Sequence, residues 1–217
     1  MSERLGRHAF ELTAAAIVAT IAAHVAHLPP WLWVGALCIV GLRVVVRRRG
    51  GPLVPIWIRL PAAGLLLTLV VMHYGTMFGR EPGSALGCGL LALKLLETER
   101  ARDARVAIAF GGFVLMSALL FEQALWFTVV VSLLLMLLLG ALVSLQPAPA
   151  DETRLLRNEL RLGAILLGVG LPLAAAGFAL VPRLSTPLWG SNDRSGEART
   201  GLGETMQPGA LTDLLID

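Results

Sequence analysis

Seven apolar segments, separated by short polar stretches, constrain the fold of this chain more than any other feature. A helix that crosses a membrane needs about 20 predominantly apolar residues, and several segments reach that length only with their polar flanks. The chain is 56% hydrophobic, whereas soluble domains are about 45–50% apolar. We therefore predict an all-α, polytopic membrane protein with about seven transmembrane helices. The segments are Leu12–Ala26, Trp31–Val46, Leu60–Met77, Ser84–Leu96, Val106–Phe121, Leu125–Leu145 and Leu162–Val181.

The longest apolar stretch, from Val106 to Leu145, is broken only by Glu122 and Gln123. As one continuous helix it would be about 60 Å long, which is about twice the thickness of the hydrocarbon core of a bilayer. The sequence therefore predicts a tight turn near Glu122 between two helices.

The positive charges predict the orientation of these helices. With seven spans and the N-terminus inside, only four of the 18 Lys and Arg residues lie on the outer side, namely Arg80, Arg183, Arg194 and Arg199. Cytoplasmic segments carry an excess of Lys and Arg, so the N-terminus is predicted to be cytoplasmic. The short segment Ser84–Leu96 must then cross the membrane, because otherwise the basic stretch 94–105 would move outside. Its Gly and Ala residues suit a position inside the helix bundle.

Several functions lack support in the sequence. The net charge of +3 comes without a basic patch interleaved with aromatic residues, which argues against nucleic-acid binding. Cys38 and Cys88 lie in apolar segments and are interpreted as small buried hydrophobic residues rather than as nucleophiles. No phosphate-binding loop, GxSxG or HExxH motif is present, and we expect no cofactor. The first apolar segment is interpreted as an uncleaved span rather than as a signal peptide.

Arg80 and Glu81 precede the fourth apolar segment at its predicted outer end. They either form a buried ion pair or ligand site, or belong to a solvated loop in which Pro82 and Ser84 start the next helix. The sequence favours the loop.

Lys94 and Glu97 end the same segment at its predicted inner end, three residues apart and thus on one helix face. They either line a polar cavity, or Lys94 reaches the interface while Glu97 pairs with Lys94 or Arg100. The second interpretation is favoured.

Other charged residues are interpreted as structural. Asp103 belongs to a charged inner stretch, 99–105, that is typical of a solvated helix end. Glu11 follows Arg7 by four residues and is expected to pair with it. Three histidines are predicted near the outer surface and are interpreted as interfacial residues rather than metal ligands: His24, His27 and His73.

The composition changes after Val181. We predict a transmembrane domain over residues 1–182 and an extracytoplasmic linker over 183–217, which is polar and punctuated by Gly and Pro. The apolar run Leu214–Ile216 at its end is expected to open a further element, so the chain is expected to be truncated.

Six short motifs follow one another along the chain, and together they contain the candidate site residues Arg80, Glu81, Lys94, Glu97, Asp103, Arg183 and Trp189. The motifs are Gly79–Gly83, Leu91–Glu97, Arg102–Ala104, Pro182–Leu184, Pro187–Gly190 and Arg199–Gly209. Each alone is unspecific. Their order and spacing resemble the N-terminal membrane region of the bacterial TgpA family of transglutaminase-like proteins.

In that family an extracytoplasmic transglutaminase-like domain with a Cys-His-Asp constellation follows the membrane region. The resemblance implies that this chain anchors such a domain in the bacterial inner membrane, and that the catalytic residues lie beyond Asp217. The implied partners are the lipid bilayer, the protein's own C-terminal domain and proteins of the cell envelope. Two alternatives stay open. One is a small-molecule or lipid transporter or channel that uses the charged pairs, and the other is a purely structural scaffold for proteins of the cell envelope.

Overall fold

The computed structural model describes residues 5–51, 54–146 and 156–180. These residues form seven α-helices and one short 3-10 helix, and the described ranges contain no strand, which confirms the predicted all-α fold. The chain divides into two units, 1–174 and 175–217, and the packing below concerns the first. The elements are α1 (Arg7–Ala22), α2 (Pro30–Arg48), α3 (Ile56–Tyr74), α4 (Arg80–Glu97), α5 (Ala101–Ser117), η1 (Ala118–Leu120), α6 (Leu125–Ser144) and α7 (Leu156–Leu180).

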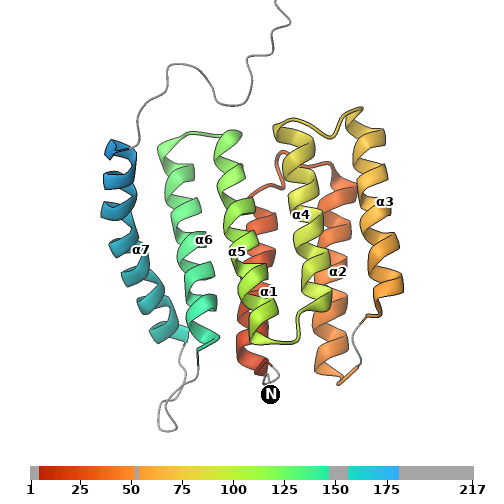
Figure 1. The fold of residues 1–217 in the computed structure, drawn as a ribbon, viewed down its shortest axis with the longest axis horizontal. Coiled ribbons are helices and arrows are strands. Elements are labelled where there is room, and N and C mark those ends of the chain that lie inside the picture. Colours follow the sequence, from red (N-terminus) through yellow and green to blue (C-terminus); the bar gives the residue numbers. More distant parts are fainter. Residues whose placement is uncertain (1–4, 52–53, 147–155, 181–217) are drawn as a thin grey trace, which may run out of the picture. The chain divides into compact units, whose positions relative to one another are not determined.

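Helix α4 lies at the centre of the bundle. It packs against α1, α2, α3 and α5, and it runs beside these helices in Figure 1. Small residues allow this close packing, since Ala85 and Ala92 have no exposed surface and Gly89 is buried. The prediction that the fourth apolar segment is sheltered among other helices is confirmed.

Helix α4 is longer than the apolar segment that predicted it. The segment Ser84–Leu96 is preceded by four further helical residues, so the helix begins at Arg80. Gly79 has a φ of 130°, which favours glycine, and it separates the helix from the preceding turn. Pro82 fits in the first turn because amides there have no helical acceptor. The interpretation of Arg80 and Glu81 as a loop is therefore wrong, since they are the first two residues of α4.

The chain turns where the sequence predicted. Helix α5 ends at Ser117, the 3-10 helix η1 follows it, and α6 begins at Leu125. Glu122 lies in the turn between them, outside any helix.

Five helical segments are long and apolar enough to cross a membrane by length and composition: α2, α3, α5 with η1, α6 and α7. Helix α1 has only 16 residues, and α4 carries Arg80, Glu81, Lys94 and Glu97. Much of the apolar surface is exposed, and Val70 is the one buried residue of α3. This surface is compatible with a membrane location, and the count of about seven spans stays a prediction.

Candidate functional site

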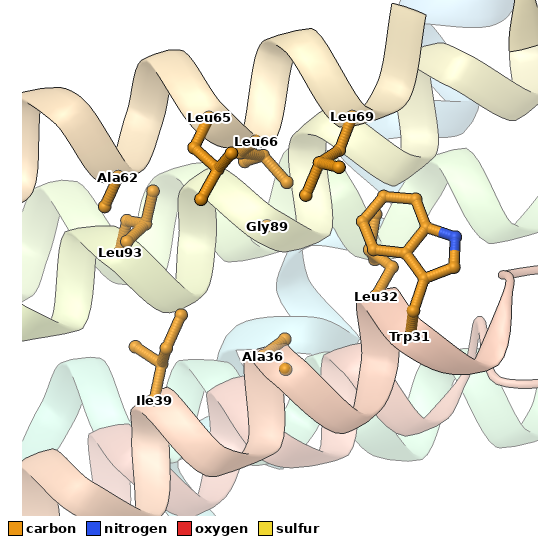
Figure 2. A pocket seen from close by; sticks show the side chains of 11 residues that line it. Trp31, Leu32, Ala36, Ile39, Ala62, Leu65, Leu66, Leu69, Gly89 and Leu93 are labelled. Carbon is orange, nitrogen blue, oxygen red and sulfur yellow. The ribbon is translucent and has the colours of Figure 1, made fainter. Parts of the chain in front are cut away.

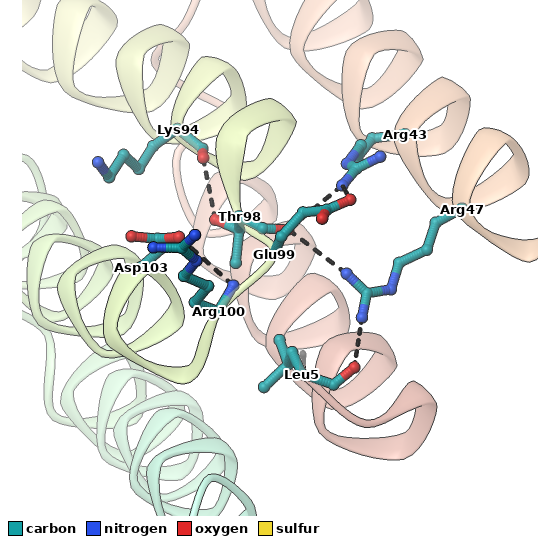
Figure 3. A network of polar contacts seen from close by, with 8 residues as sticks. All are labelled: Leu5, Arg43, Arg47, Lys94, Thr98, Glu99, Arg100 and Asp103. Atoms are coloured by element: carbon teal, nitrogen blue, oxygen red, sulfur yellow. Dashed lines mark hydrogen bonds and ion pairs between the residues drawn. The ribbon is translucent and has the colours of Figure 1, made fainter. Parts of the chain in front are cut away.

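Polar side chains gather at the two opposite ends of the bundle. At the end where α1 begins, residues of α2 and of the α4–α5 connection meet the start of the described chain. We call this group the arginine cluster: Leu5, Arg43, Arg47, Thr98 and Glu99 (Figure 3). At the opposite end lies a polar hollow of about 510 Å³, lined by Ala26, His27, Leu28, Pro29, His73, Tyr74, Arg80, Glu81 and Phe121.

Arg43 is the most buried charge of the cluster, with 1% of its surface exposed. Its Nη2 atom donates to the Thr98 carbonyl oxygen at 3.3 Å and to Glu99 Oε1 at 3.4 Å. Its guanidinium lies 5.7 Å from the centre of the Phe10 ring. The Nε and Nη1 atoms of Arg43 are buried without a hydrogen-bond partner. Burying a charge costs free energy unless the charge is paired. The Glu99 carboxylate is the group that offsets this cost for Arg43.

Arg47, one helical turn further along α2, links three segments. Its Nη1 donates to the Thr98 carbonyl oxygen at 3.5 Å, and its Nη2 donates to the Leu5 carbonyl oxygen at 2.5 Å. The guanidinium lies 4.2 Å from the centre of the Phe10 ring, within cation–π range. The Leu5 amide in turn donates to the Glu99 carbonyl oxygen at 2.8 Å. The cluster therefore ties the end of α4 to both α1 and α2.

Arg43 and Arg47 were not among the site residues predicted from the sequence. The available signal was their spacing of four, which places both on one face of an otherwise apolar helix. Their partners are more than 40 positions away in the sequence, so the sequence could suggest a buried polar face but not what it meets.

Lys94 and Glu97 form the ion pair that their spacing predicted. Glu97 also accepts a hydrogen bond from Arg59 Nη1 at 2.7 Å, a partner from α3 that the sequence analysis missed. Arg100 is not a partner of Glu97 in the described structure. Glu97 thus joins α3 to the end of α4, and the interpretation of the pair as a structural one is supported.

We expect Glu97→Ala to lower the stability of the protein by about 1 kcal/mol, because it leaves Lys94 and Arg59 facing each other without an acid. Lys94→Met is expected to cost less, since Arg59 still pairs with Glu97. The measurement is thermal unfolding in detergent, with Glu122→Ala as a control because Glu122 makes no ion pair among the described residues. Unchanged stability of the Glu97 variant would contradict the prediction.

Asp103 acts as a helix-capping residue rather than as part of a cavity. The Arg100 amide donates to Asp103 Oδ2 at 3.4 Å, and Figure 3 shows this contact at the start of α5. The contact is exposed, as expected for a solvated helix end. The expected pair of Glu11 and Arg7 is wrong, since Glu11 Oε1 instead lies 2.9 Å from Arg48 Nε of α2.

The polar hollow contains both members of the first charged pair. Arg80 and Glu81 are exposed, and no ion pair among the described residues joins them. The Arg80 guanidinium lies 5.6 Å from the centre of the Phe121 ring. His27 stacks on the same ring, with the ring centres 4.6 Å apart. The pair is therefore not a buried ion pair, and both side chains are accessible to a ligand.

The three histidines have different surroundings. His24 is buried, with Nδ1 3.0 Å from the Thr20 carbonyl oxygen and Nε2 3.1 Å from Ser117 Oγ, so it packs within the protein, and its depth near the membrane interface stays a prediction. His27 and His73 both line the polar hollow. Within the described ranges, no group of three or more potential ligands could hold a metal ion.

The remaining candidate residues add no nucleophilic site. Cys38 on α2 is exposed, Cys88 on α4 is buried, and both are free thiols. The burial expected for Cys38 is therefore wrong. Arg183 and Trp189 lie outside the described residues, as does the whole predicted linker.

Comparisons with known proteins place these features in a family. Residues 12–215 match the TgpA N-terminal domain. The chain is 33% identical over 197 residues to a protein-glutamine gamma-glutamyltransferase of Pseudomonas aeruginosa, a match that covers 91% of this chain and 29% of the relative. No solved structure matches. Because the family match covers nearly the whole chain, this protein belongs to the TgpA N-terminal domain family.

Proposed function

We propose that this chain is the membrane-anchoring N-terminal module of a transglutaminase-like enzyme whose catalytic domain lies outside the cytoplasmic membrane. The observation that carries the proposal is the family match over residues 12–215. The gamma-glutamyltransferase name of the relative suggests the chemistry. The chain spans only 29% of that relative, so the relative has ample further length for a catalytic domain.

The proposed reaction is acyl transfer from the side chain of a glutamine. A cysteine thiolate would attack the glutamine amide and release ammonia, and an amine would then accept the acyl group from the thioester. Such a nucleophile needs a nearby base or cation that favours the thiolate. Cys38 and Cys88 are the two cysteines of this chain, and among the described residues no hydrogen bond or ion pair joins either thiol to a base or a cation. We therefore assign the nucleophile to a part of the protein outside this chain.

The transporter alternative finds little support in the structure of α4. A transport path along this helix would need polar groups between its two charged pairs. The intervening buried positions are instead mostly apolar, namely Ala85, Cys88, Leu91, Ala92 and Leu95. We therefore prefer the anchoring role, in the bacterial inner membrane and with the N-terminus in the cytoplasm.

The test uses the full-length protein and the incorporation of a primary amine into a glutamine-containing peptide. We expect Cys38→Ala and Cys88→Ala to keep activity within about twofold, because neither thiol has, among the described residues, the partner that nucleophilic catalysis requires. Residues 1–217 alone should insert into membranes and show no turnover. Loss of activity in a folded Cys38 or Cys88 variant would contradict the assignment, and absence of turnover by the full-length protein would contradict the proposed chemistry.

A further inference from the structure

An apolar groove of about 260 Å³ lies between α2 and α3, with α4 behind it (Figure 2). Helices α2 and α3 both pack against α4 but have little contact with each other, which leaves the groove between them. All of its lining residues are apolar: Trp31, Leu32, Gly35, Ala36, Ile39, Ala62, Leu65, Leu66, Leu69, Gly89 and Leu93. A hydrocarbon chain matches such a surface, because no polar group is left unpaired when the chain enters.

Small residues keep the groove open on the side of α2. A Cβ atom added at Gly35 would meet no heavy atom within 4 Å, so the space beside this residue is empty. At the back of the groove, a Cβ atom added at Gly89 of α4 would come within 2.5 Å of the Leu66 side chain of α3, so α3 packs directly on α4 at this point. A bulky residue at position 35 can therefore fill the groove without disturbing the packing around α4.

The groove and the polar hollow lie next to one another, on either side of a shared set of residues. A third hollow, of about 350 Å³, is lined by Trp31, Leu69, Met72 and His73. It shares Trp31 and Leu69 with the apolar groove and His73 with the polar hollow. The rings of Trp31 and His73 lie 6.0 Å apart, edge to face, at this passage. An amphiphile with its tail in the groove would thus have its head at the polar hollow.

The polar hollow offers one cation and one anion. Arg80 and Glu81 are both exposed and do not pair with each other in the described structure. A phosphate matches the guanidinium of Arg80, and an ammonium group matches the carboxylate of Glu81. A purely anionic head would satisfy Arg80 but be repelled by Glu81. The charge pattern therefore favours a head group that carries both charges.

We propose that the apolar groove and the polar hollow form one binding site for a zwitterionic phospholipid with an ammonium head group. One acyl chain occupies the groove beside Gly35, the phosphate lies at Arg80 and the ammonium at Glu81. An acyl chain gains little free energy when it moves from the surrounding lipid into the groove, because both are apolar. The contacts of the head group must therefore supply the selectivity between lipids. The site rests on the membrane location in the proposed function but not on the transglutaminase chemistry.

The test is thermal unfolding of the delipidated full-length protein in micelles with added dioleoylphosphatidylethanolamine or dioleoylphosphatidylglycerol. We expect the ethanolamine lipid to raise Tm by about 3 °C and the glycerol lipid to raise it clearly less. Gly35→Phe should abolish this rise. Gly41→Phe is the matched control, because Gly41 lies on the same helix, is exposed and has equally open space but does not line the groove.

Two further variants test the two proposed contacts of the head group separately. Glu81→Gln should remove the preference for the ethanolamine lipid, and Arg80→Gln should weaken the effect of both lipids. Equal shifts with the two lipids, or equal losses in the Gly35 and Gly41 variants, would overturn the site. A dimer that persists when lipid is added and is lost in Gly35→Phe would overturn it in favour of a second copy of the chain. If Gly35→Phe does not fold, Gly35→Val serves in its place.

Amine incorporation by the same preparations separates the two proposals. Turnover without lipid selectivity rejects the lipid site alone, and lipid selectivity without turnover rejects the enzymatic chemistry alone.

Discussion

Replacing Glu99 by alanine is expected to destabilise the helix bundle by about 2–3 kcal/mol, whereas Arg43→Met should cost about 1 kcal/mol. The asymmetry follows from burial, since Arg43 is 1% exposed and already has two nitrogen atoms without a partner. Without Glu99, its charge would be opposed by no carboxylate among the described residues, and the Thr98 carbonyl oxygen and the face of the Phe10 ring would remain. Methionine would remove the charge and keep apolar contact with Phe10. The expected cost of the Glu99 variant lies below that for a fully buried pair because Glu99 is 29% exposed.

Thermal unfolding of the purified protein in detergent measures both effects, and the double variant tests their common cause. Arg43→Met combined with Glu99→Ala should be about as stable as Arg43→Met alone, because Glu99 then has no buried charge to balance. Arg49→Met provides the control, since Arg49 lies at the exposed end of α2. If Glu99→Ala were tolerated as well as Arg49→Met, the pair would have no structural role.

The apolar segments predicted all seven α-helices of the described residues but not the ends of these helices. Apolar residues mark only the part of a helix that faces lipid or the protein core. A helix can continue past this part into charged residues, and hydropathy does not detect that continuation. Helix α4 starts four residues before its apolar segment, at Arg80, and α5 starts at Ala101 rather than at Val106. The first segment was predicted to reach Ala26, whereas α1 ends at Ala22 and turns follow. Helix ends depend on local turn geometry, which hydropathy does not contain.

The candidate site was predictable only where both partners lie on one helix. Lys94 and Glu97 are three residues apart, so helical geometry alone brings them together. Arg43 and Glu99 are 56 positions apart and meet only because α2 packs beside α4 in one particular register. The wrong prediction that Glu11 pairs with Arg7 has the same cause. Arg7 on its own helix and Arg48 on α2 are both within reach of the exposed Glu11 carboxylate, and the sequence does not show that α2 lies beside α1. The apolar groove depends on the separation of α2 and α3, which no sequence pattern fixes.

Reporter fusions at four positions are expected to alternate between the two sides of the cytoplasmic membrane. A reporter that is active only outside should be active after Thr76 and after Gly190, and inactive after Gly51 and after Arg100. The physical reason is the unequal distribution of positive charge, since only four of the 18 Lys and Arg residues fall on the outer side in this orientation. The arginine cluster and the Lys94–Glu97 pair would then lie at the cytoplasmic end, and the polar hollow at the outer end.

The fusions after Thr76 and Arg100 flank α4 and decide whether this helix crosses. With four charged residues, α4 is not among the five helical segments that are long and apolar enough to cross a membrane. These charges lie in its first two and last four positions, near the polar surfaces of a bilayer. Its 18 residues give a length of about 27 Å, close to the hydrocarbon thickness of about 30 Å. Opposite activities on its two sides, confirmed by a second reporter active only in the cytoplasm, would establish the crossing. Equal activities would make α4 a re-entrant helix and would move the basic stretch that follows it to the outer side, against the charge rule from which the orientation was derived.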